Sequence, residues 1–145
     1  MPTMQAIHAD IRALPVAAIV SAADEPSLGS GAEGATITPA YDLAADFIIH
    51  TVGPVWQGGE QGEAELLYSC YRDCISIAEQ HGISSIAFPV ISTGSFDYPI
   101  REATKVAVAA VSAAVEGTKV IGEVIFCCDT KADLAHYRAV LMQPS

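Results

Sequence analysis

The stretch SSIAFPVISTGSFDYP, residues 84–99, decides the predicted fold of this chain. Its first half is a short apolar run, which is typical of a buried strand. The run REATKVAVAAVSAAVEG, residues 101–117, follows directly and consists of good helix formers that end at a glycine. A strand that leads straight into a helix is the repeating unit of a parallel α/β sheet, and such sheets bind ligands where their strands end.

The turn between this strand and this helix, residues 92–96, has the chemistry of an anion site. Ser92, Thr93, Gly94 and Ser95 offer successive backbone N–H groups, and Gly94 lacks the Cβ that would keep a phosphate away. The N-terminus of the following helix adds the positive end of its dipole. An ordinary turn with capping residues explains the same sequence equally well, so these residues alone leave both interpretations open.

The charge of the chain restricts the kinds of partner that it can have. Seventeen acidic residues against seven basic ones give a net charge of −10. Duplex nucleic acid and anionic membrane surfaces both require a basic patch, so we expect neither as a partner. An anionic ligand would therefore be held by backbone amides and a helix dipole. No apolar run reaches the roughly 18 residues of a membrane span, and no signal peptide is recognisable, so a cytoplasmic location is expected.

The remaining elements alternate in the same way over one domain, residues 1–145. Residues 24–45 are rich in Gly, Pro, Ser and Thr and predict a long loop with an irregular strand near residues 35–38. Alternating strands and helices indicate an α/β fold with a mostly parallel sheet. Strands are expected at 4–9, 16–23, 46–52, 84–91 and 123–128, and helices at 63–82, 101–117 and 131–142.

The four cysteines are predicted to be small, reduced core residues. Cys70 and Cys74 are four residues apart in a helical pattern, and Cys127 and Cys128 are adjacent in a strand, so the latter two should point to opposite faces. Neither pair has the spacing of a zinc site, and we expect no metal and no cofactor.

Six stretches carry a resemblance to a known family that covers nearly the whole chain. They are HADIRAL (8–14), AAIVSAAD (17–24), SLGSG (27–31), FIIHTVGPVW (47–56), CYRDCISIA (70–78) and SSIAFPVISTGSFDYP (84–99). Their order and spacing resemble those of macrodomains. The resemblance implies a three-layer α/β/α fold with a central mixed, mostly parallel sheet. It also implies a cleft for ADP-ribose or a related phosphate-bearing nucleotide, free or attached to an ADP-ribosylated protein.

The resemblance also implies roles for individual residues. Asp10 would accept a hydrogen bond from the adenine amino group, and the backbone of Ile11 would lie near the adenine. Ser92, Thr93, Gly94, Ser95 and Phe96 would form the diphosphate loop, with Phe96 beside the ribose. The alternatives are a solvated or helix-capping carboxylate for Asp10 and ordinary core packing for Ile11.

Two departures from the family pattern affect the cleft. The family's Asn-Ala-Ala-Asn is Ser21 to Asp24 here, so Asp24 occupies the place that the family's hydrolases use near the distal ribose. A carboxylate there can accept hydrogen bonds but cannot donate them. Part of the Gly-rich loop and a covering helix are also missing between about residues 31 and 34, together with the segment that holds the hydrolases' catalytic Asp.

Three functions from different classes follow from these observations. The leading one is a binding module for ADP-ribose or a related nucleotide, with Ser21 as a further ligand contact. The second is a hydrolase of ADP-ribosyl or O-acyl-ADP-ribose substrates, with Asp24 as the candidate catalytic residue. Whether the chain is an enzyme stays open. The third is a degenerate scaffold that forms a homodimer, because a missing helix would leave apolar surface exposed.

Overall fold

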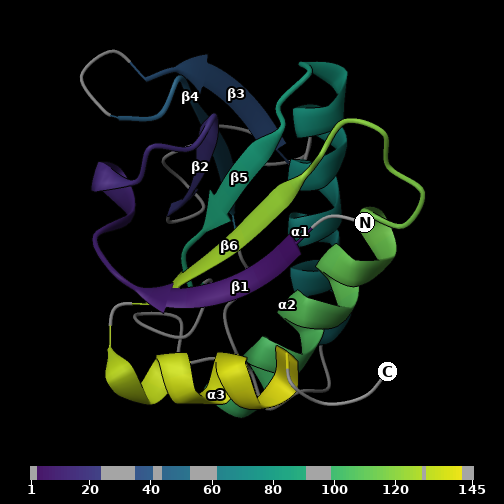
Figure 1. Ribbon diagram of the computed structural model, residues 1–145. Coiled ribbons are helices and arrows are strands. Elements are labelled where there is room, and N and C mark those ends of the chain that lie inside the picture. Colours follow the sequence, from purple (N-terminus) through teal and green to yellow (C-terminus); the bar gives the residue numbers. More distant parts are fainter. Residues whose placement is uncertain are drawn as a thin grey trace.

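Apolar segments rich in β-branched residues form a single mixed sheet (Figure 1). The computed structural model describes residues 3–23, 35–40, 44–52, 62–90, 99–128 and 130–141. The strands are β1 (Thr3–His8), β2 (Ala18–Ala23), β3 (Ala35–Pro39), β4 (Phe47–Val52), β5 (Ser85–Phe88) and β6 (Glu123–Cys128). The helices are the 3-10 turn η1 (Ile11–Ala13), α1 (Glu63–Gln80), α2 (Ile100–Ala114) and α3 (Lys131–Leu141).

The strand order is β1-β6-β5-β2-β4-β3. All neighbouring pairs are parallel except β3 with β4, which is antiparallel. The carboxyl ends of β1, β6, β5, β2 and β4 therefore meet at one edge of the sheet. This arrangement confirms the predicted α/β fold with a mixed, mostly parallel sheet.

The three α-helices form one layer on one face of the sheet. α1 packs against α2, and α2 packs against α3 (Figure 1). Because side chains alternate along a strand, Ile86 and Phe88 of β5 point into this layer and Ala87 points away from it. The main core lies between this helical layer and the sheet, and it includes Leu67, Ile75 and Val111, each no more than 1% exposed.

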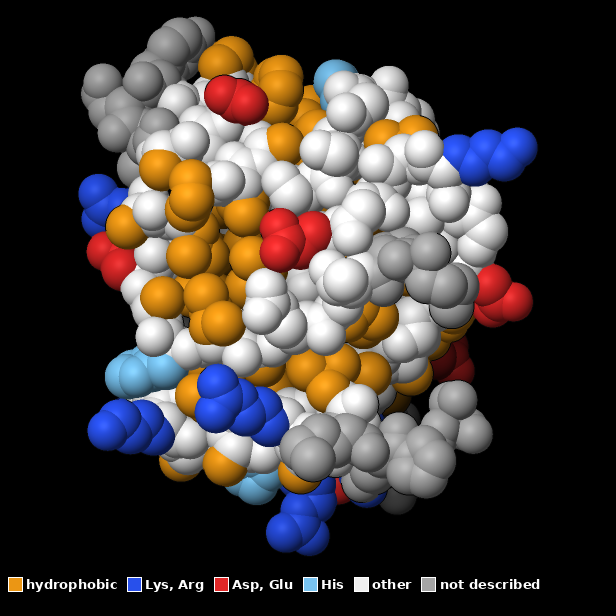
Figure 2. Space-filling view, viewed as in Figure 1, with side chains coloured by type: hydrophobic (Ala, Val, Ile, Leu, Met, Phe, Trp, Pro, Cys, Tyr) orange, Lys and Arg blue, Asp and Glu red, His pale blue; other side chains and the backbone are white. Residues whose placement is uncertain are grey.

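The opposite face of the sheet carries η1 and a smaller apolar cluster. Ile19 and Ile125 belong to this cluster and are 4% and 7% exposed. Ile7, Ile11 and Leu14 pack against it and are half-buried. Figure 2 shows hydrophobic side chains gathered on the side of the molecule where η1 lies. In the described part of the chain, the 3-10 turn is the helical element on this face.

A row of four aromatic rings, called here the aromatic ladder, joins the helical layer to the neighbouring strands β5 and β6. Tyr71 of α1 lies 5.1 Å from Phe88, Phe88 lies 6.0 Å from Phe126, and Phe126 lies 5.0 Å from Tyr137 of α3, measured between ring centroids. Aromatic pairs at such distances contribute about 0.5–1.5 kcal/mol each beyond their burial. The ladder therefore holds α1 and α3 against the sheet.

All four cysteines are free thiols and buried, as predicted. Burial is the main cause that raises the pKa of Cys70, and it raises the pKa of Cys74 well above its usual range. These two thiols therefore stay protonated at neutral pH and are poor nucleophiles. Among the described helices, none is long and apolar enough to cross a membrane.

Candidate functional site

The order of the strands changes direction between the neighbouring parallel strands β2 and β5. From β5 the chain continues to β6 on one side, and from β2 it continues to β3 and β4 on the other. Connections that leave in opposite directions open a crevice, and open α/β sheets bind their ligands in it. The topology therefore places the candidate site at the ends of β2 and β5.

The predicted diphosphate loop is attached directly to this point. β5, a central strand, ends at Phe88, and α2 begins at Ile100 with Pro99 as its N-cap. Among the described residues, no side chain caps this helix, because Pro99 has no side-chain acceptor to offer its first backbone N–H groups. A helix of 15 residues presents the positive end of its dipole there. Both features favour an anionic ligand.

Asp10 lies at the same edge, immediately after β1, and its side chain is exposed. Its Oδ1 accepts a hydrogen bond from the backbone N–H of Arg12 at 3.0 Å, and its carbonyl accepts one from Ala13 at 3.0 Å. The carboxylate is thus the N-cap of η1, which is the capping role weighed from the sequence. A carboxylate has two oxygens, so Oδ2 can still accept a hydrogen bond from a ligand.

Ile11 and Ser21 both belong to the helix-poor face. Ile11 is half-buried and packs against the smaller apolar cluster, which agrees with the core-packing interpretation. Ser21 is half-buried in β2, on the same face as Ile19, and is paired in register with His50. The Nε2 of His50 lies 2.8 Å from Thr38 Oγ1, so this histidine has a structural partner.

The other predicted site residues lie outside the described residues. They are Asp24, Ser92, Thr93, Gly94, Ser95 and Phe96. The structure brings together the strand ends to which they are attached. From β1, which leads to Asp10, to β2, which leads toward Asp24, there are three strand spacings of about 4.8 Å, or roughly 14 Å.

Cys127 is a residue near this edge whose contact was not anticipated from the sequence. Its Sγ donates a hydrogen bond to the carbonyl oxygen of Ala9 at 3.0 Å, and the side chain is 3% exposed. The predicted alternation of Cys127 and Cys128 is observed, since Cys128 belongs to the main core. The contact with Ala9 depends on the pairing of β1 with β6, which no local pattern reveals.

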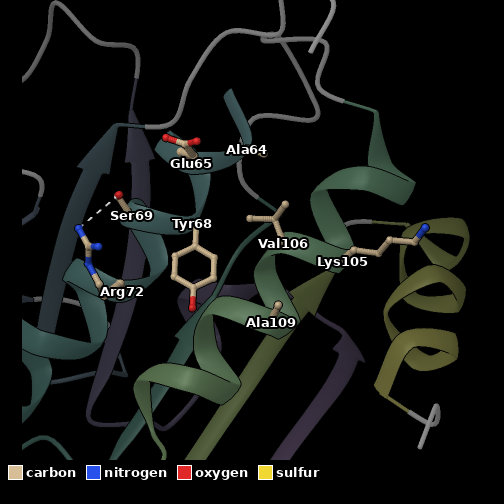
Figure 3. A pocket seen from close by; sticks show the side chains of 8 residues that line it. All are labelled: Ala64, Glu65, Tyr68, Ser69, Arg72, Lys105, Val106 and Ala109. Carbon is tan, nitrogen blue, oxygen red and sulfur yellow. Dashed lines mark hydrogen bonds between the residues drawn. The ribbon is translucent and has the colours of Figure 1, made fainter. Parts of the chain in front are cut away.

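A separate groove of about 540 Å³ lies between α1 and α2 (Figure 3). Its apolar members include Tyr68, Val106 and Ala109, and its charged members are Glu65, Arg72 and Lys105. Arg72 donates a hydrogen bond to Ser69 and contacts Asp73 at 3.4 Å. The described residues that line this groove all belong to α1 and α2, and none of them lies at a strand end.

Potential metal ligands do not cluster in the described part of the chain. Within the described ranges, no group of three or more His, Cys, Asp or Glu side chains is arranged to hold a metal ion.

An α/β sheet with these features at its carboxyl edge belongs to the nucleotide-binding class of architectures. The family model of the Macro domain matches residues 9–107, and the chain belongs to this family. A macro domain-containing protein of Chlorobaculum tepidum is 42% identical over 163 aligned positions, covering 95% of each chain. The O-acetyl-ADP-ribose deacetylase of Salmonella typhimurium is 39% identical, covering 97% of this chain and 94% of the relative.

Solved structures are similar in fold over the same extent. The Oceanobacillus iheyensis macrodomain with ADP has a TM-score of 0.88 and 28% identity, covering 97% of this chain and 90% of that one. The Trypanosoma brucei macrodomain in complex with ADP-ribose has a TM-score of 0.85 and 26% identity, covering 95% of this chain and 68% of that one. Both relatives hold an adenosine diphosphate group in their solved complexes.

Proposed function

We propose that this protein binds ADP-ribose, or a closely related phosphate-bearing nucleotide, at the carboxyl edge of its sheet. The observation that carries the proposal is that β5, a central strand, ends at Phe88 and that α2 begins at Ile100, so that the chain between them must pass the carboxyl edge of the sheet and the N-terminus of this helix. The backbone amides of residues 92–96 would hold the diphosphate, and Asp10 would accept from the adenine amino group. The complexes of two relatives with ADP and ADP-ribose support this assignment.

Calorimetric titration tests this proposal. ADP-ribose should bind with a dissociation constant near micromolar, about −8 kcal/mol, and inorganic phosphate should bind far more weakly. Gly94→Glu should abolish binding, because it places a side chain and a negative charge where the diphosphate must approach. Gly122→Glu is the matched control, because Gly122 precedes β6 at the opposite edge of the sheet and is exposed, and a Cβ added there would meet only the Ser84 carbonyl, at 3.8 Å. Absence of heat and of a thermal shift at millimolar ADP-ribose would overturn the proposal.

Hydrolysis of an ADP-ribose derivative is the second candidate function. The similarity to the Salmonella O-acetyl-ADP-ribose deacetylase favours it. The segment with the family's usual catalytic Asp is missing, so Asp24 would have to hold and activate the attacking water. Turnover of O-acetyl-ADP-ribose that is lost in Asp24→Ala, with ADP-ribose binding retained, would support an enzyme. Binding without turnover in the wild type would leave a binding module.

We also propose that the chain is one macrodomain that lacks part of the Gly-rich loop and a covering helix between about residues 31 and 34. The alignment with the Chlorobaculum tepidum relative has 163 positions against 145 residues in this chain, so at least 18 positions have no residue here. The presence of η1 as the helical element on the second face, within the described ranges, is consistent with the loss of a helix there.

The partner of this site would be a nucleotide, either free or carried on an ADP-ribosylated protein. The homodimeric scaffold has less support. It was expected because a missing helix would leave apolar surface exposed, which a second copy of the chain would then cover. Of the large hydrophobic side chains in the described ranges, Leu66 is the exposed one, at 55%. On the sheet face opposite the α-helices, the apolar residues Val16, Ile19, Ala45, Ala87 and Ile125 are buried.

A further inference from the structure

Where β1 leaves the sheet, its backbone accepts a hydrogen bond from a residue that is distant in the sequence. β1 and β6 pair in parallel up to Ile7 with Cys127 and His8 with Cys128. Ala9 is the first residue beyond the pairing. The buried thiol of Cys127 donates to its carbonyl at 3.0 Å, across 118 residues of sequence.

The backbone makes hydrogen bonds on both sides of the next residue, Asp10. On its N-terminal side, the Ala9 carbonyl accepts a hydrogen bond from the Cys127 thiol. After it, the backbone N–H groups of Arg12 and Ala13 are bound by the Asp10 carboxylate and carbonyl. A rotation of the Ala9–Asp10 peptide would break the thiol contact and would also move the carboxylate. A hydrogen bond to a base edge is directional, so such a movement weakens it steeply.

We propose that Cys127 is a positioning residue, whose thiol fixes the backbone that presents the Asp10 carboxylate to the adenine amino group. This role rests on the proposed nucleotide binding. It differs from simple core filling, because it requires the donor and not merely the volume of the side chain. Cys128 provides the natural comparison: it is equally buried and adjacent in β6, but it faces the helical layer beside Tyr137.

The experiment compares ADP with inosine diphosphate, which lacks the exocyclic amino group. Wild-type protein should prefer ADP by about tenfold, the size expected for a hydrogen bond to a charged acceptor. Cys127→Ala should reduce this preference to about threefold or less while the affinity for inosine diphosphate stays unchanged. Cys127→Ser, which retains a donor, should restore the preference, and Cys128→Ala should keep it.

Amide hydrogen exchange gives a second measurement without ligand. Exchange of the Arg12 amide, which depends on the Asp10 carboxylate, should speed up in Cys127→Ala and not in Cys128→Ala. An unchanged ADP preference in Cys127→Ala would overturn the role of Cys127 alone. An equal loss for both nucleotides, or an equal effect of both alanine variants, would show general destabilisation and would also overturn it. A wild type that binds neither nucleotide would overturn the proposed function and this role with it.

Discussion

Asp10 uses one carboxylate oxygen to cap η1 and has a second oxygen that can face a ligand. The sequence offered these two roles as alternatives, because the context HADIRAL resembles the family and because an acid in a loop can also cap a helix. The contact of Cys127 with Ala9 could not be predicted in the same way. It depends on which strands are neighbours, and local residue patterns do not encode strand order.

Two substitutions separate the roles of Asp10. Asp10→Ser keeps a side-chain cap for η1 and removes the carboxylate, whereas Asp10→Ala removes both. We expect both variants to lose about tenfold or more in ADP-ribose affinity, since a hydrogen bond to a charged group is worth about 1.5–3 kcal/mol. Calorimetry and thermal unfolding measure the two effects. If Asp10→Ser binds like the wild type, Asp10 is a cap and not a ligand contact.

The buried thiols predict a loss of stability at alkaline pH. The folded protein raises the pKa of Cys70 and Cys74 above the value of about 8.5 in the unfolded chain. Their contribution is therefore complete below about pH 8.5 and is lost as the pH rises toward the folded values. Each thiol should lower the free energy of unfolding by up to about 1.4 kcal/mol per pH unit.

Urea unfolding under reducing conditions between about pH 8 and 10 measures this slope. Cys74→Ala should reduce the slope, although it also lowers stability at every pH by leaving a small cavity. A slope that is the same in Cys74→Ala and in the wild type would show that this thiol does not ionise differently in the two states.

Among the elements, the strands and helices were predicted within a few residues. β4, for example, contains Ile48 and Ile49 in a run of β-branched residues, and α1 has apolar residues at helical spacing. η1 was not predicted, because three residues are too few to show a period. Strand order, and the position of α1, α2 and α3 on one face of the sheet, result from long-range packing. Local sequence patterns therefore could not predict them.

The two ends of the aromatic ladder give an element-level prediction. Tyr71 and Tyr137 are both fully buried, and their hydroxyls interact without reaching the geometry of a full hydrogen bond. Burial raises the pKa of Tyr137 above its usual range, and the Tyr71 hydroxyl offsets part of this shift. Either Phe substitution alone should cost about 1–3 kcal/mol, because it leaves the other hydroxyl buried without this neighbour.

The double variant Tyr71→Phe with Tyr137→Phe tests this coupling. It should be close to the wild type in stability, so that the double-mutant cycle gives a coupling of about 2 kcal/mol or more in urea unfolding. Additive effects of the two substitutions would mean that the hydroxyls do not support each other and that the ladder acts through its rings alone.

The net charge of −10 predicts an unusual response of ligand binding to salt. A site made of lysines and arginines loses affinity for an anion as salt screens the attraction. Here the overall field repels the ligand, and short-range backbone amides provide the binding. ADP-ribose affinity should therefore be unchanged or higher when salt is raised from about 50 to about 500 mM. A steep decrease in calorimetric titrations would point to a basic site instead.

The covered sheet face predicts that the protein is a monomer. Light scattering after size exclusion should give the monomer mass of 15.1 kDa at micromolar concentration. A stable dimer would contradict this expectation. Its candidate interface would be formed by the half-buried apolar residues around η1, namely Ile7, Ile11 and Leu14. Substitution of Leu14 by Lys would then be expected to dissociate it, with Leu66→Lys as the control on the opposite face of the sheet.

An amide NMR titration of the protein with ADP-ribose tests the proposed site most directly. Binding at the strand ends should give saturable shifts at residues 92–96 and at Asp10 and Arg12, with the α1–α2 groove unaffected. Shifts confined to groove residues such as Tyr68 and Val106, or no shifts at all, would contradict a nucleotide site at the strand ends.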